Sequence, residues 1–171
     1  SPGGRSLSES DFQLSSRGQG FNLLLCGVTK VNVDGAWNES SNLGGVGVIV
    51  RNDSGDFIAV TSVRITHDDQ GWSVIGAAKG FQNFILECDS LKIVAALRDS
   101  SPFPFNVRIV VKDSRELMAS ITEVSYTHVR RQANGIAHRL ARAAIRSESS
   151  RCWFKEPPDL ILDLLIKESG L

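Results

Sequence analysis

The chain from residue 28 to residue 65 reads VTKVNVDGAWNESSNLGGVGVIVRNDSGDFIAVTSVRI. Valine alternates with polar residues over 31–34, and this period of two predicts a strand with one apolar face. A second strand follows the polar cluster at 38–42. A third strand, over residues 57–65, follows the hairpin signal Asn52-Asp53-Ser54-Gly55. The stretch therefore predicts an antiparallel meander of three strands.

The segments after the meander predict a mixed α/β fold. Residues 74–79 are long enough for only a turn or two of helix, and residues 107–121 combine a β-branched start with helical spacing that favours a helix. Residues 89–90 can cap a helix, and Pro157-Pro158 can start one. The expected order is strand 82–88, helix from Leu91, helix 107–121, strand 123–129, helix 132–146 and a short amphipathic helix after Pro158.

Composition limits the domain organisation and the class of protein. The 171 residues are 42% hydrophobic and suit one domain with tails. We expect a flexible Ser- and Gly-rich tail over 1–27, a domain over 28–147 and a C-terminal extension over 148–171. The 19 basic and 19 acidic side chains argue against a broadly polybasic binder, so a nucleic-acid contact must come from a local patch. No apolar run approaches the length of a membrane span.

Three cysteines, Cys26, Cys88 and Cys152, lie far apart in the sequence. Their odd number and the lack of a CxxC pattern argue against a disulfide framework and a structural zinc site. We interpret them as buried thiols in a reducing compartment, which predicts an intracellular protein of the nucleus or the cytoplasm.

Two acidic residues stand out by position. Asp34 lies on the polar side of the first strand, and Asp89 follows the fourth strand at a strand-to-helix junction. Carboxyl ends of strands are common ligand sites in α/β folds, and two carboxylates from neighbouring strands could hold Mg²⁺. Each residue also has a simpler interpretation: Asp89 as a helix N-cap, and Asp34 as an exposed strand residue near a turn.

The chain contains four short motifs: VNVDGA at 31–36, GGVGVIVR at 44–51, ECDS at 87–90 and HVRRQANGIAH at 128–138. In this order they resemble the ribonuclease H-like domain that is common in plant genomes, many copies of which look derived from retroelement reverse transcriptases. The resemblance covers about residues 29–146, and residues 153–165 look like the tail that often follows that domain. It implies a mixed five-stranded sheet of order 3-2-1-4-5 flanked by helices.

In active members of that family, four carboxylates hold two Mg²⁺ ions that cleave the RNA strand of an RNA–DNA hybrid. By this resemblance Asp34 and Asp89 match two metal ligands, and His128 matches a loop histidine credited with proton transfer or product release. Gly76 stands where the family has a glutamate, and His138 stands where it has the last aspartate. We therefore expect Mg²⁺ binding to be weak or lost and hydrolysis to be impaired.

The arginines around the last domain helix have two interpretations, a track for the backbone phosphates of a duplex or a solvated helix face. The candidate nucleic-acid contacts are Arg130, Arg131, Arg139 and Arg142. The first helix of the family pattern is shortened here, which predicts an apolar patch on one sheet face for the tail helix or a protein partner to cover. Three functions follow: a hybrid-cleaving enzyme, a catalytically inactive nucleic-acid-binding module, and a protein-interaction module.

Overall fold

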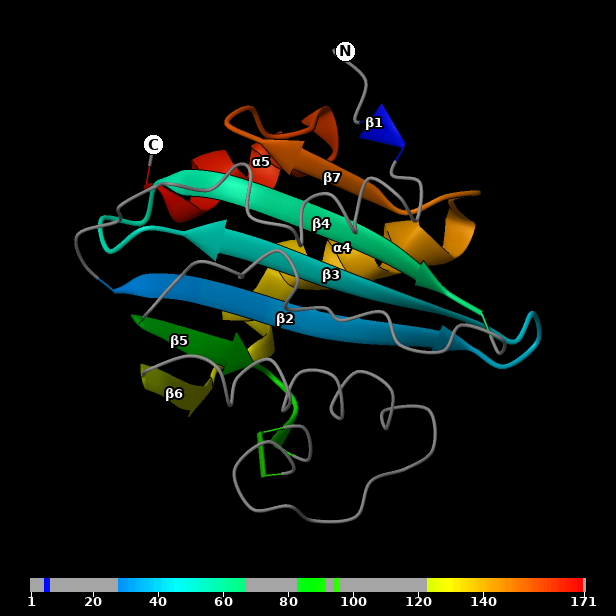
Figure 1. The fold of residues 1–171 in the computed structure, drawn as a ribbon, viewed down its shortest axis with the longest axis horizontal. Helices are drawn as coiled ribbons and strands as arrows, with labels where there is room; N and C mark the ends of the chain where they lie inside the picture. Colours follow the sequence, from blue (N-terminus) through cyan, green and yellow to red (C-terminus); the bar gives the residue numbers. More distant parts are fainter. Residues whose placement is uncertain (1–4, 7–27, 67–82, 92–93, 96–122, 171) are drawn as a thin grey trace.

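The computed structural model describes residues 5–6, 28–66, 83–91, 94–95 and 123–170. Seven strands form one sheet, with the order β1-β7-β4-β3-β2-β5-β6 (Figure 1). Within the described part, no helix is both long and apolar enough to cross a membrane. The elements are β1 (Arg5–Ser6), β2 (Thr29–Asn38), β3 (Leu43–Arg51), β4 (Phe57–Ile65), β5 (Asn83–Cys88), β6 (Glu123–His128), the 3₁₀ helix η2 (Arg131–Asn134), α4 (Gly135–Arg146), β7 (Arg151–Phe154) and α5 (Asp159–Glu168).

The centre of the sheet confirms the predicted fold class. Strands β2, β3 and β4 form the antiparallel meander, and β2 pairs in parallel with β5, which pairs in parallel with β6. The resulting order β4-β3-β2-β5-β6 is the five-strand order 3-2-1-4-5 that the resemblance implies. The ends of β2 and β5 that point the same way therefore meet at one edge of the sheet.

Two strands extend the sheet beyond this expectation. β7 pairs antiparallel with β4, although its residues were expected to be part of a C-terminal extension with only a helix. The hydroxyl of Thr61 on β4 and the buried thiol of Cys152 on β7 lie 3.4 Å apart. β1, within the expected tail, pairs with β7, and the rest of the tail lies outside the described residues.

Helix α4 packs against β3 with its backbone almost in contact with the strand. A Cβ atom added to Gly45 would lie 2.0 Å from the carbonyl oxygen of Ala141, and one added to Gly47 would lie 2.0 Å from that of Ala137. Only glycine allows this approach. The buried residues of α4 therefore include these two alanines, whereas Ile145, which was expected to face inward, is only half-buried.

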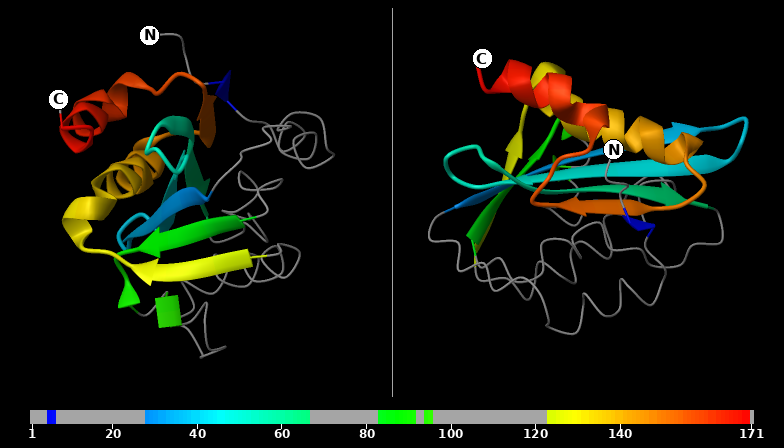
Figure 2. Two further views of the ribbon diagram at one scale, coloured as in Figure 1. Left: turned by 90° about the vertical axis from the view of Figure 1, so that its left-hand side faces the viewer. Right: turned by 90° about the horizontal axis from the view of Figure 1, so that it is seen from above.

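Helix α5 lies on the same face of the sheet as α4 (Figure 2). The Leu164 side chain is 3.9 Å from the Cβ position of Gly135 at the start of α4. Leu160 was expected on the buried side of α5 but is 41% exposed. The core between the two helices and the sheet is formed by Ile49, Val60, Ile136, Leu140 and Ile161.

On the opposite face of β3, the side chains are buried, which differs from the predicted apolar patch. Val46, Val48 and Val50 alternate with the residues that contact α4, and each is no more than 2% exposed. An exposed apolar sheet face is therefore wrong for this central strand. The helices predicted over 74–79 and 107–121 lie outside the described residues, as does Gly76.

Candidate functional site

The two predicted carboxylates meet at the edge where β2 and β5 end. Asn32 pairs with Glu87 across these parallel strands, and the same register continued by two residues brings Asp34 level with Asp89. Asp34 pairs with Gly47 on its other side, so its side chain is on the face covered by α4. The fold therefore gathers at one place the two acidic residues that sequence analysis selected.

Both carboxylate oxygens of Asp34 accept hydrogen bonds from the protein. The backbone N–H of Gly35 donates to Oδ1 at 2.9 Å, and Nδ1 of His138 lies 2.6 Å from Oδ2. Behind the imidazole, the Arg131 guanidinium lies 3.4 Å from Nε2. Because arginine can only donate, this contact assigns the imidazole proton to Nδ1, from which it is donated to Asp34.

The surroundings of Asp34 raise its pKa. Burial raises the pKa of Asp34 above its usual value of 3.8, and the negative charge of Asp89 raises it further. The hydrogen bonds from His138 and from the Gly35 backbone act in the opposite direction. The net rise in pKa shows that these donors only partly offset the cost of holding two carboxylates together with little access to water.

Asn134 joins the second carboxylate to the sheet and was not selected by sequence analysis. Its Nδ2 donates to Oδ1 of Asp89 at 3.1 Å and to the carbonyl oxygen of Val33 at 2.9 Å. The residue is 1% exposed and lies at the N-cap of α4. The signal in the sequence was available, because Asn134 lies between His128 and His138 and precedes the helix by one residue, where asparagine is usually interpreted only as a cap.

His128 ends β6, and the candidate arginines Arg130, Arg131 and Arg142 follow it in the sequence. Nε2 of the exposed His128 is 3.1 Å from the carbonyl oxygen of Asp89. Arg130 and Arg131 lie in an exposed segment, and Arg142 is exposed one helical turn after His138. His128 contacts Asp89 and Arg131 contacts His138, so these two side chains lie at the same edge as the carboxylates.

Arg139 differs from the other predicted arginines. Its guanidinium donates to Oδ1 of Asp163 at 2.5 Å and to the carbonyl oxygen of Leu160 at 3.0 Å, both on α5. Consecutive helical residues differ by about 100° around the axis, so Arg139 does not share the face of His138. The guanidinium of Arg139 therefore links α4 to α5, a contact that the sequence analysis did not predict.

The described residues do not fit a pair of Mg²⁺ ions. Within ranges 28–66, 83–91, 94–95 and 123–170, no group of three or more His, Cys, Asp or Glu side chains is placed to hold a metal. Asp34 and Asp89 both accept hydrogen bonds from protein groups, and Glu87 on β5 accepts one from Asn32 at 2.8 Å. A hard cation that prefers several oxygen ligands would have to displace these donors.

Comparison with known proteins agrees with this arrangement. A family model described as reverse transcriptase-like matches residues 75–144. This segment contains Asp89, His128, Asn134 and His138, but not Asp34. No curated protein matches the chain.

Solved structures extend the similarity to most of the chain. RNase H1 from the halophilic archaeon Halobacterium salinarum superposes with a TM-score of 0.57 at 24% identity, covering 70% of this chain and 98% of that one. The N-terminal RNase H domain of a Mycobacterium tuberculosis protein gives 0.56 at 19% identity, covering 70% and 94%. LC11-RNase H1 bound to an RNA/DNA hybrid gives 0.52 at 17% identity, covering 69% and 96%. The chain therefore has the RNase H-like fold.

Proposed function

We propose that this RNase H-like chain is a nucleic-acid-binding domain that recognises RNA–DNA hybrids and has impaired hydrolysis. The observation that carries the proposal is the 2.6 Å contact between Nδ1 of His138 and Oδ2 of Asp34. Because of this contact, an Asp34 oxygen that a metal ion would need is already hydrogen-bonded to a protein group. The other carboxylate, Asp89, which directly follows β5, itself accepts a hydrogen bond from Asn134.

Charge gives the physical reason for the impaired hydrolysis. Relative to the family pattern, Gly76 and His138 each replace a carboxylate, so about two negative charges are missing from the site that would hold two divalent ions. Imidazole is a poor ligand for Mg²⁺, and water in place of a carboxylate does not restore the charge. Because of this loss of charge, Mg²⁺ binding is weak or lost, and no reaction step is assigned to a metal ion.

Exposed arginines support the proposal that the chain binds an RNA–DNA hybrid. Arg130, Arg131 and Arg142 are exposed, Arg131 contacts His138 beside Asp34, and such arginines can contact backbone phosphates without reading sequence. The LC11 structure of the same fold was solved with an RNA/DNA hybrid, which makes this duplex the first ligand to test.

A cleavage assay separates the impaired site from an active one. A labelled RNA–DNA hybrid is incubated with the wild-type chain and with Asp34→Asn, in Mg²⁺ and in Mn²⁺. We expect both proteins to leave the RNA strand uncut, because the charge that would hold the ions is already missing in the wild type. Metal-dependent cleavage by the wild type that disappears in Asp34→Asn would show an active enzyme and refute impaired hydrolysis.

A binding assay tests the other half of the proposal. Fluorescence anisotropy with the same hybrid should give an affinity that falls as salt rises, with a slope reduced by about 0.9 in Arg142→Gln if that residue contacts one phosphate. An affinity that does not change with salt would contradict backbone recognition.

A protein partner is the second candidate, favoured by one observation. Leu162 and Ile166 lie one turn apart on α5 and are 38% and 55% exposed. Substitution of both by glutamate should leave hybrid binding unchanged if α5 serves a protein partner, whereas loss of hybrid binding would place α5 in the nucleic-acid site.

A further inference from the structure

We infer that the chain Arg131–His138–Asp34 takes the place of divalent cations at this site, so that the protein contacts a nucleic-acid backbone without metal. The inference rests on the proposed hybrid binding and states how that binding is achieved. Its basis is the linear arrangement of the three side chains, with Arg131 3.4 Å from Nε2 of His138 and Nδ1 of His138 2.6 Å from Asp34.

The charge of this site differs from that of a site with four carboxylates. A site with four carboxylates repels a phosphate until cations neutralise it, since like charges at short distance in a partly buried site repel strongly. Here the Arg131 guanidinium lies 3.4 Å from Nε2 of His138, whose Nδ1 contacts Asp34. Arg131 therefore brings a permanent positive charge to this edge of the sheet before any metal is added.

The carboxylate oxygens that a metal ion would need accept hydrogen bonds from the protein. Gly35 and His138 donate to the two oxygens of Asp34, and Asn134 donates to Oδ1 of Asp89. Asn134 is almost fully buried and is also bonded to the Val33 carbonyl, so moving its amide away from Asp89 would break a second hydrogen bond. The protein itself thus performs the stabilising role that cations would have at these carboxylates.

Arg131 is accessible to a ligand. It is exposed and lies in η2, between His128 at the end of β6 and the start of α4. One of its five N–H donors points to His138, and a guanidinium presents the others as a fork that suits a phosphate. His138 therefore orients Arg131 on one side and donates a hydrogen bond to Asp34 on the other.

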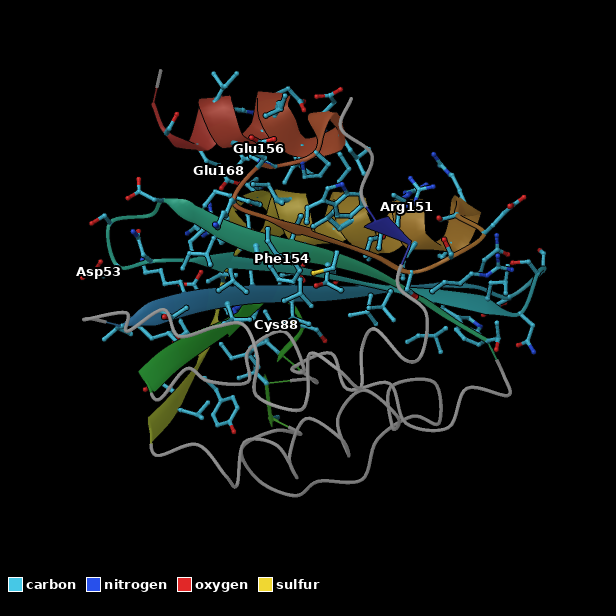
Figure 3. All side chains as sticks on the ribbon, turned by 45° about the horizontal axis from the view of Figure 1, so that its top comes forward. Asp53, Cys88, Arg151, Phe154, Glu156 and Glu168 are labelled. Atoms are coloured by element: carbon cyan, nitrogen blue, oxygen red, sulfur yellow. The ribbon has the colours of Figure 1, made fainter. Side chains whose placement is uncertain are left out.

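The test measures hybrid binding with and without metal. Fluorescence anisotropy of a labelled RNA–DNA hybrid is recorded in EDTA and in millimolar Mg²⁺ at matched ionic strength. The proteins are the wild type, Arg131→Gln, His138→Asp and the control Arg151→Gln, which removes an exposed arginine from β7 (Figure 3), a strand separated from β5 by three others. Thermal unfolding of each protein confirms that it is folded.

The inference predicts equal wild-type affinity in the two buffers. Arg131→Gln should bind about five- to tenfold more weakly near 0.1 M salt, with a salt slope smaller by about 0.9, as for the loss of one phosphate contact. Arg151→Gln should behave as the wild type. His138→Asp should bind weakly in EDTA and recover in Mg²⁺, because it adds a carboxylate that requires a cation.

The contrary outcomes separate the two proposals. Wild-type binding that requires Mg²⁺, equal effects of Arg131→Gln and Arg151→Gln, or undiminished binding by His138→Asp in EDTA would overturn the inference and leave hybrid binding standing. Failure of the wild type to bind the hybrid in either buffer would overturn the proposed function, and the inference with it.

Discussion

Two adjacent residues of α4, His138 and Arg139, each contact a carboxylate from a distant part of the chain, but their surroundings differ. The His138–Asp34 pair is enclosed between α4 and β2, with side chains 27% and 11% exposed. The Arg139–Asp163 pair lies between α4 and α5, with side chains 37% and 66% exposed. The contact distances, 2.6 and 2.5 Å, are almost the same.

This comparison shows that distance alone does not rank such contacts. An exposed ion pair gains little because water and salt screen it, whereas a donor beside a partly buried carboxylate offsets a real desolvation cost. The pKa directions agree with this difference. Arg139 lowers the pKa of the exposed Asp163 by its hydrogen bond, whereas burial raises the pKa of Asp34 despite the hydrogen bond from His138. Both contacts depend on the position of α4.

The largest expected effect comes from displacing α4, which would break both contacts together. Gly47→Ala places a methyl group 2.0 Å from the carbonyl oxygen of Ala137, so backbone must move. We expect the free energy of unfolding, measured with urea, to fall by about 3 kcal/mol or more.

The matched control for this substitution is Gly135→Ala in the same helix. Gly135 has helical backbone angles, and its Cβ would be 3.9 Å from the Leu164 side chain. This change should stabilise the protein by up to about 1 kcal/mol. A Gly47→Ala protein as stable as the wild type would mean that α4 does not depend on this close approach.

The next effect concerns only the enclosed side of α4. Asn134→Ala removes the hydrogen bonds to the Val33 carbonyl and to Asp89, and leaves these acceptors buried without that donor. We expect a loss of about 2 kcal/mol in urea unfolding. Asn38→Ala, which removes an exposed hydrogen bond from the Ser41 backbone, is the control and should cost less than about 1 kcal/mol. Equal losses in the two variants would refute the structural role of Asn134.

A smaller effect, with a defined dependence on pH, is expected at Asp34. Because its pKa is raised in the folded state, the folded protein binds the proton more tightly, and stability falls as the pH rises above 3.8 through the folded pKa. Asp34→Asn keeps an acceptor for His138 without the buried charge, so it should stabilise the protein at pH 7 by up to about 1 kcal/mol. Thermal unfolding from pH 3 to pH 7 should show this gain disappearing toward acid. A gain that is the same at every pH would contradict the raised pKa.

The smallest effect belongs to the exposed side of α4. A double-mutant cycle with Arg139→Gln and Asp163→Asn should give a coupling energy below about 1 kcal/mol that decreases with added salt. Urea unfolding of the four proteins measures it. A coupling larger than the loss in Asn134→Ala would reverse the comparison between the two sides of α4.

Much of the site followed from local sequence. The alternation around Asp34 and the strand ending before Asp89 identified two residues that the fold brings to one edge, and the family resemblance added His128. Asn134 was missed because its position is equally typical of an ordinary helix cap. The contact of Arg139 with α5 was not predicted, because a charged residue on a predicted helix face does not reveal whether another helix will cover that face.

The sequence by itself determined the meander, the two strands at 83–88 and 123–128, helix α4 and the two carboxylates, because these depend on periodicity and turn chemistry among near neighbours. Only the tertiary structure decided that β7 joins the sheet, that α5 lies beside α4, and that His138 reaches Asp34 while Arg139 reaches Asp163. Those outcomes depend on strand register and on the rotation of a helix around its axis. Both are set by packing between residues far apart in the chain, here by the approach of α4 to Gly45 and Gly47.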